Sequence, residues 1–300
     1  CVVFACILLF SPQPLRAEFV IDSNDIGADD VIPDPMTWTS ETSAHIGDID
    51  NGDLLVYGNE QIQTSHAYIG YTTNSTGTVT IEGPDATWIN SGYFYVGRYG
   101  DATLNIINGA KVHTASAFVS YAYASGSAAT VSGPGSTWIT TNRLTVGQSG
   151  TGTLTITNGG LVRVGELLTI DAGYWSSAST TMALAINTYG SDNYVNDSSD
   201  GFINMANGGM LALYGGDPDF TLTDFLNLIE GDGIIQYWDT NIANWANITD
   251  ATDGDDYTLV HHTDGDLAGY TVLTVGIVPE PSTVILMLTT LTGWFFVRRR

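Results

Sequence analysis

Residues 87–97, TWINSGYFYVG, decide the fold, because their landmarks return 50 positions later in residues 137–147, TWITTNRLTVG. Further landmarks keep the same distance: Gly83-Pro84 and Gly133-Pro134, Asn108-Gly109 and Asn158-Gly159, and Thr37-Trp38 ahead of Thr87-Trp88. A period held over three copies indicates a repeat architecture.

A shorter repeat runs inside each 50-residue unit: a small or apolar residue, any residue, a β-branched residue, and then usually Gly. It occurs at residues 44–47, 67–70, 94–97, 117–120, 144–147 and 168–171, in steps of 23, 27, 23, 27 and 24 residues. A unit of this size cannot enclose a core alone, so units must stack and share one interior. We expect Ile69, Val96, Val119 and Val146 to point inward in this stack.

Apolar residues alternate with Thr or Asn in Thr78–Ile81, Thr103–Ile106 and Thr153–Ile156, which predicts strands with one buried face. We therefore expect an all-β chain whose residues 33–216 form a parallel β-helix, or β-solenoid, with two coils per 50 residues. Its crossovers are expected to be right-handed. A β-propeller ranks second, because only three 50-residue units are visible and the 23/27 subdivision would be unexplained.

Two series of residues each allow two interpretations. Asn108 and Asn158, with Asn207 as a third member, are either good turn residues or an asparagine ladder between coils. Trp38, Trp88 and Trp138 form a row that could stack on sugar rings if exposed and that packs the interior if buried.

The repeat pattern of residues is lost after the solenoid, and residues 217–277 are expected to form a C-terminal cap over the last coil. A short helix is expected where apolar residues cluster between Phe220 and Ile229. Strands are expected at Ile234–Trp238, Tyr257–Val260 and Tyr270–Val275.

The N-terminal residues 1–17 hold both cysteines, Cys1 and Cys6, and combine an apolar stretch, Val2–Phe10, with a small-residue site near Ala17, which indicates a secretory signal peptide without its basic start. Its removal would exclude disulfides and a thiol enzyme. Residues 18–32 form an acidic lead-in. The formal net charge of −24, with 8 Lys and Arg in all, argues against nucleic acid as a partner.

The C-terminal residues combine three signals in order. Val278-Pro279-Glu280-Pro281 precedes the apolar run 284–297, and Arg298, Arg299 and Arg300 end the chain. The prolines favour an extended motif, and the arginines would hold the end of a membrane segment on the cytoplasmic side.

This tail resembles the PEP-CTERM sorting signal, and the repeat is similar to the β-strand repeat of such sorted proteins and of autotransporter passengers. The resemblance implies export through the inner membrane of a Gram-negative-type cell. It also implies recognition of Pro279, Glu280 and Pro281 by an exosortase, and delivery to the cell surface or extracellular matrix.

Candidate chemistry is sparse. Asp48, Asp50 and Asp53 suggest a weak calcium site, but the spacing is not that of an EF-hand and a turn is the favoured interpretation. A polysaccharide lyase would need a convergent acid and base, yet Arg98 corresponds to Asp48 and Gln148 in the neighbouring units.

The expected function is therefore that of an exported, non-catalytic surface or matrix protein without a cofactor, calcium excepted. The expected partners are the exosortase, transiently the inner membrane, and extracellular polysaccharide. A carbohydrate-binding adhesin is the first alternative and a lyase-like enzyme is the second.

Overall fold

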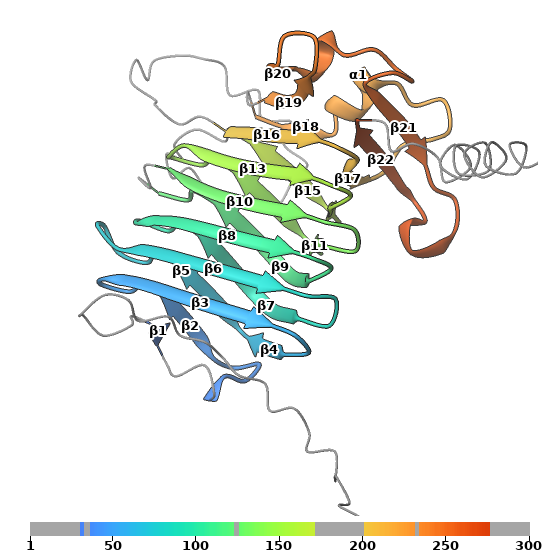
Figure 1. Ribbon diagram of the computed structural model, residues 1–300. Coiled ribbons are helices and arrows are strands. Elements are labelled where there is room, and N and C mark those ends of the chain that lie inside the picture. Colours follow the sequence, from blue (N-terminus) through green and yellow to red (C-terminus); the bar gives the residue numbers. More distant parts are fainter. Residues whose placement is uncertain (1–30, 33–36, 123–125, 172–200, 232–233, 277–300) are drawn as a thin grey trace, which may run out of the picture.

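The computed structural model describes residues 31–32, 37–122, 126–171, 201–231 and 234–276. They form a parallel β-solenoid of about five turns, whose coils stack from blue to orange in Figure 1. Parallel pairing of successive coils confirms the repeat interpretation and excludes the β-propeller. The predicted signal peptide (1–17) and sorting tail (278–300) lie outside the described residues.

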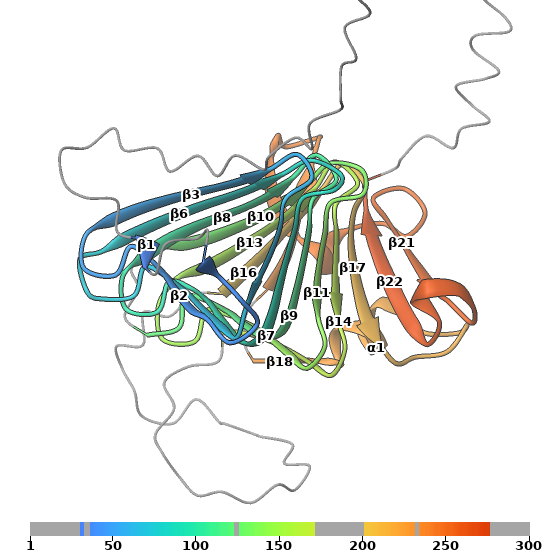
Figure 2. The ribbon, with the colours of Figure 1, turned by 90° about the horizontal axis from the view of Figure 1, so that it is seen from below.

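The first segment of each coil belongs to an 8-stranded sheet, which Figure 2 shows along one side of the stack. Its strands are β3 (Asn51–Tyr57), β6 (Thr76–Glu82), β8 (Asp101–Ile107), β10 (Ser127–Ser132), β13 (Gly152–Thr157), β16 (Gly201–Ala206), β19 (Ile234–Asp239) and β20 (Asn244–Asn247). All pair in parallel except the last hairpin, β19–β20.

The second and third segments belong to a 14-stranded sheet that folds around the core. Second segments are β4 (Gln61–Thr64), the first half of β7 (Thr87–Val96) and of β9 (Lys111–Val119), β11 (Thr137–Thr140), β14 (Leu161–Val164) and β17 (Gly209–Tyr214). Third segments are β2 (Ser43–Ile46), β5 (His66–Ile69), the second halves of β7 and β9, β12 (Arg143–Val146), β15 (Leu167–Ile170) and β18 (Ile229–Glu230).

The core is continuous from coil to coil. The third segments are paired so that one inward column contains Ile46, Ile69, Val96, Val119, Val146 and Ile170. Each of these side chains is at most 1% exposed, which confirms the predicted inward positions. Apolar surface removed from water in this way is the main stabilising contribution.

The 50-residue period arises because two kinds of coil alternate. From β3 to β13, equivalent residues of the 8-stranded sheet are 25 positions apart, as in Thr78 and Thr103. In the second segment the separations alternate between 26 and 24, as in Gln61, Thr87 and Lys111. The extra residues lie in the turns and bends, so two unequal coils make one sequence repeat.

The longer coils enclose larger side chains. Trp88 and Phe94 share one long coil and are fully buried, with ring centroids 5.0 Å apart. The next coil is shorter and places Val112 and Ala117 at the equivalent positions. Trp138 then returns in the following long coil. The predicted tryptophan period therefore reflects alternation in the width of the core.

The residue closing each third segment has a left-handed backbone. Gly70 has φ 66°, and an added Cβ there would lie 2.3 Å from the carbonyl oxygen of Asp101. Glycine therefore avoids both strain and a clash with the neighbouring coil. Ser120 (φ 63°) and Asp171 (φ 55°) hold the same conformation without being glycine.

The asparagines act as turn residues that also bond to the preceding coil. Asn108 and Asn158 have φ 56° and 52°. Asn108 Nδ2 donates to Glu82 Oε1 at 2.8 Å, and Asn158 Nδ2 donates to Ser132 Oγ at 3.1 Å. Asn108 and Asn158 do not stack on each other, because Gly133 occupies this turn position in the coil between them. Asn158 and Asn207 do hold equivalent positions in paired coils, just after Thr157 and Ala206.

Both described ends of the stack carry antiparallel strands. At the N-terminal end, β1 (Val31–Ile32) pairs with β2. At the other end, β22 (Tyr270–Val275) pairs with β17 and with β21 (Tyr257–His261). Helix α1 (Leu222–Leu226) buries Phe225 in the core. The three predicted strands and a short helix are confirmed, but the helix ends at Leu226 and Ile229 belongs to a strand, β18, which was not predicted. Strand β20 was not predicted either.

No helix in the described ranges is long and apolar enough to cross a membrane. The predicted membrane segment, residues 284–297, lies outside those ranges.

Candidate functional site

The tryptophan row does not offer a sugar-binding surface. Trp88 and Trp138 are 0% exposed, and Trp38 lies half-buried with its ring centroid 5.6 Å from that of Trp88. A sugar cannot reach the face of a fully buried ring. The structure therefore corrects the glycan-stacking hypothesis for Trp88 and Trp138 and supports the packing interpretation for them.

The three aspartates of the weak calcium candidate are not gathered into one site. Asp48 follows β2 and its Oδ1 lies 2.7 Å from His45 Nδ1, whereas Asp53 is exposed on β3. The described residues contain no group of three or more His, Cys, Asp or Glu side chains that could hold a metal ion. Asp48, Asp50 and Asp53 thus do not form the calcium site that the sequence suggested.

The sorting-motif residues Val278, Pro279, Glu280 and Pro281 lie outside the described residues, as do Arg298, Arg299 and Arg300.

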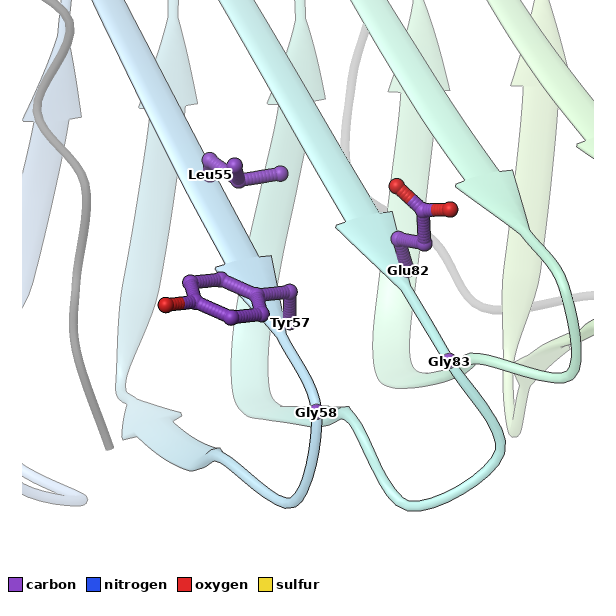
Figure 3. A pocket seen from close by; sticks show the side chains of 5 residues that line it. All are labelled: Leu55, Tyr57, Gly58, Glu82 and Gly83. Carbon is purple, nitrogen blue, oxygen red and sulfur yellow. The ribbon is translucent and has the colours of Figure 1, made fainter. Parts of the chain in front are cut away.

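A shallow hollow of about 430 Å³ lies on the outside of the first coils and is lined by Leu55 and Tyr57 of β3 and by Glu82 of β6 (Figure 3). Gly58 and Gly83 complete its lining. Its one carboxylate, Glu82, already accepts a hydrogen bond from Asn108. Acid–base chemistry would need a second titratable group, and the lining residues include none besides the phenol of Tyr57.

A more distinctive feature is a column of outward aromatic rings on the third segments. His45, Tyr68, Tyr95 and Phe118 hold equivalent positions in four successive coils. Their successive ring centroids are 4.8, 5.3 and 5.0 Å apart. The Tyr68 and Tyr95 rings are 7° from parallel, and the Tyr95 and Phe118 rings are 13° from parallel. The inter-coil spacing of about 4.8 Å matches the distance at which aromatic rings stack.

A second column lies beside these rings, just after the closing residue of each third segment. Tyr71, Arg98 and Tyr121 are equivalent there, because each backbone N–H donates to the closing-turn glycine of the preceding coil, at 2.8 to 3.0 Å. The Tyr121 ring stands at 77° to Tyr95 and at 82° to Phe118. We call the two columns, His45, Tyr68, Tyr95 and Phe118 with Tyr71, Arg98 and Tyr121, the aromatic–arginine face.

Arg98 lies at the centre of this face. Its Cζ is 5.0 Å from the ring centroid of Tyr68, 4.9 Å from that of Tyr71 and 5.6 Å from that of Tyr95. The exposed Tyr99 contributes a fourth ring at 5.2 Å. Electron-rich ring faces attract the guanidinium, and several together hold it in one place.

The surroundings of Tyr95 keep its hydroxyl in the neutral form. Burial raises the pKa of the Tyr95 phenol above its ordinary value of 10.0, and nearby Tyr121 adds to the rise while Arg98 opposes it. A neutral phenol both donates and accepts hydrogen bonds. The face therefore combines a fixed cation, Arg98, with the neutral hydroxyl group of Tyr95, and the Asp48 carboxylate lies beside His45 at its first coil.

The sequence contains a signal for this face, although the repeat pattern was used to predict only the inward residues. The second residue of the four-residue repeat is His45, Tyr68, Tyr95 and Phe118 in the first four coils. Side chains alternate between the two faces of a strand, so an aromatic residue beside each inward position must point outward.

Comparisons with protein-family models, with curated proteins and with solved structures found no match.

Proposed function

We propose that the chain is an exported, non-catalytic structural protein of the cell surface or extracellular matrix of a Gram-negative-type bacterium. The β-solenoid forms its body, and residues 278–300 form the sorting signal that an exosortase reads. The proposal combines the resemblance of the tail to the PEP-CTERM signal with the architecture of the described residues.

The continuous core is the structural observation that supports this proposal. Inward side chains such as Val96 and Val146 line up from coil to coil and are fully buried. Stability in such a stack comes from contacts between neighbouring coils, which yields an elongated and self-supporting body. An elongated body with a regular outer surface suits a structural or adhesive role.

The sorting step is tested in the native bacterium, with its exosortase gene intact and deleted. With the gene intact, we expect the chain at the cell surface or in the matrix. After deletion, we expect it to remain in the inner-membrane fraction, because the apolar run 284–297 would stay inserted. Equal distribution in both strains, or recovery in the cytosol, would disprove the sorting proposal.

A variant within the motif sharpens the experiment. Glu280→Gln removes the carboxylate between the two prolines and should cause membrane retention in the intact strain. Glu230→Gln is the matched control, because Glu230 is an exposed carboxylate on β18 and outside the motif. If both variants are released like the unmodified chain, Glu280 is not part of the recognised motif.

A further inference from the structure

Charge is distributed unevenly along this acidic chain. Residues 87–165 contain four cations, Arg98, Lys111, Arg143 and Arg163, and one carboxylate, Asp101, for a formal charge of 4 − 1 = +3. The whole chain carries −24. Surface charges separated by more than about 8 Å are largely screened at physiological salt. The strongly acidic flanks are therefore screened from an anion that approaches the central coils, although the four cations lie on different strands and turns and do not form one patch.

Arg98 has aromatic neighbours in place of a carboxylate partner. Within the part of the chain that the structure describes, the ion pair observed is His45–Asp48, and none involves Arg98. Its Nε is buried and has no hydrogen-bond partner among the described residues. Buried polar groups normally find a partner, and a guanidinium fork matches a carboxylate with two parallel hydrogen bonds. The buried Nε cannot reach an external anion, but Arg98 is partly exposed and forms no ion pair among the described residues, so its terminal nitrogens are the donors that remain for one.

The shape of the face suits an extended ligand. The stacked column crosses four coils, which corresponds to a length on the order of 14 Å. Tyr95 and Phe118 within it are only 8% and 7% exposed, so a ligand would contact the more exposed tyrosines around them. Tyr93 and Tyr99 extend the aromatic surface beyond it and are 49% and 38% exposed. Aromatic side chains with one apolar body and one polar end cover the C–H faces of sugars while their hydroxyls bond to sugar oxygens.

We infer that the aromatic–arginine face binds an acidic polysaccharide, with Arg98 donating hydrogen bonds to the carboxylate of a uronic acid unit. The half-exposed tyrosines beside it pack against the adjoining sugar rings, and the coil repeat allows the polymer to lie along the stack. This inference is independent of the sorting tail and holds whether or not an exosortase processes the chain.

The probe is a pair of ligands, an oligogalacturonate and its fully methyl-esterified counterpart, which share one sugar backbone and differ in whether each carboxyl is charged or carries a methyl ester. Binding to the full chain, kept in a non-ionic detergent, is measured by calorimetry. We expect the acid form to bind at least about tenfold more tightly than the ester. Its affinity should fall as salt rises from about 50 mM to about 500 mM.

Variants locate the site. Arg98→Gln should weaken binding of the acid form at least about tenfold, and Arg98→Lys should lose less because it keeps the charge without the planar fork. Lys111→Gln is the matched control. Lys111 lies in the second-segment half of β9, away from the aromatic columns, so this variant removes a cation without altering the face. It should change the affinity less than about twofold.

A second variant protects the test against misfolding. Tyr99→Ala removes an exposed ring beside Arg98 without opening the core. It should weaken binding about fivefold or more, since a well-packed aromatic contact contributes on the order of 1 kcal/mol. Thermal melts monitor the fold of every variant.

Three results would overturn the inference: no binding by the unmodified chain, equal binding of acid and ester, or equal losses in Arg98→Gln and Lys111→Gln. If Arg98→Gln does not fold, an unchanged affinity of Tyr99→Ala for the acid form would also overturn the inference.

Discussion

The indole nitrogen of Trp88 donates a hydrogen bond to Thr64 Oγ1 in the preceding coil, at 2.9 Å. Thr64 Oγ1 also accepts from Asn90 Nδ2 at 2.9 Å, so the contact belongs to a small buried network. Trp138 holds the equivalent core position two coils further on, yet its indole nitrogen has no partner among the described residues. The two tryptophans thus differ in hydrogen bonding although both are fully buried.

This difference predicts unequal costs for the same substitution. Trp88→Phe and Trp138→Phe remove similar volumes from the core, but only Trp88→Phe breaks a hydrogen bond. Trp138→Phe instead removes a buried donor that has no partner. We expect Trp88→Phe to lower the free energy of unfolding by about 1 kcal/mol more than Trp138→Phe. Denaturant unfolding followed by tryptophan fluorescence measures both, and equal losses would contradict the assigned network.

Glycines with the same backbone conformation should tolerate alanine to different degrees. Gly58 (φ 72°) has open space around an added Cβ, whereas at Gly70 (φ 66°) the Cβ would lie 2.3 Å from a carbonyl oxygen of the next coil. Gly58→Ala should cost about 1–2 kcal/mol, the strain of a left-handed alanine. Gly70→Ala should cost clearly more, because the coils must also separate. Comparable melting temperatures for the two variants would argue against the close approach at Gly70.

The inward column was predictable from the sequence because buried strand positions produce a regular alternation of apolar and polar residues. Val96 and Val119 follow a period-2 alternation, and a turn with a left-handed backbone follows each of them. The exposure of Trp88 was not predictable, because a large apolar ring fits either face of a strand. Only the folded coil, which turns Trp88 and Phe94 of one strand toward the same interior, settles that question.

The candidate site was harder to predict than the core, since it depends on which coils become neighbours. Tyr71 and Arg98 are 27 positions apart in sequence and belong to different coils, yet the Arg98 Cζ lies 4.9 Å from the Tyr71 ring centroid. The total charge of −24 also hides the positive central coils. Composition averages over the chain, whereas recognition depends on local charge.

Core and surface positions on one strand should respond differently to truncation. On β8, Leu104 is fully buried and the neighbouring Thr103 points outward. Leu104→Ala should lower the free energy of unfolding by about 2–5 kcal/mol, through lost burial and a cavity shared by neighbouring coils. Thr103→Ala should change it by about 0.5 kcal/mol or less. Chemical denaturation compares them, and a small loss for Leu104→Ala would contradict a tightly packed interior.

Glu60 gives the fold a pH dependence of predictable sign. It is 2% exposed, its Oε1 has no hydrogen-bond partner among the described residues, and the equivalent positions in the next two coils are Ala86 and Ala110. Burial raises the pKa of the Glu60 carboxyl above its ordinary value of 4.5, and a hydrogen bond from the Tyr57 backbone opposes the rise only partly. The folded chain thus holds this proton to higher pH than the unfolded chain.

The sign follows from the protons bound in each state. Below about pH 4 the carboxyl is protonated in both states, so it adds no pH dependence there. As pH rises from the ordinary pKa through the raised folded value, the unfolded state releases the proton first and stability falls. Glu60→Gln cannot ionise, so it should raise the melting temperature at pH 7 and lose that advantage near pH 4. Melts from pH 4 to pH 8 measure this, with the exposed Glu41→Gln as control. A Glu60→Gln variant less stable than the unmodified chain at pH 7 would show that the buried carboxylate has a stabilising partner.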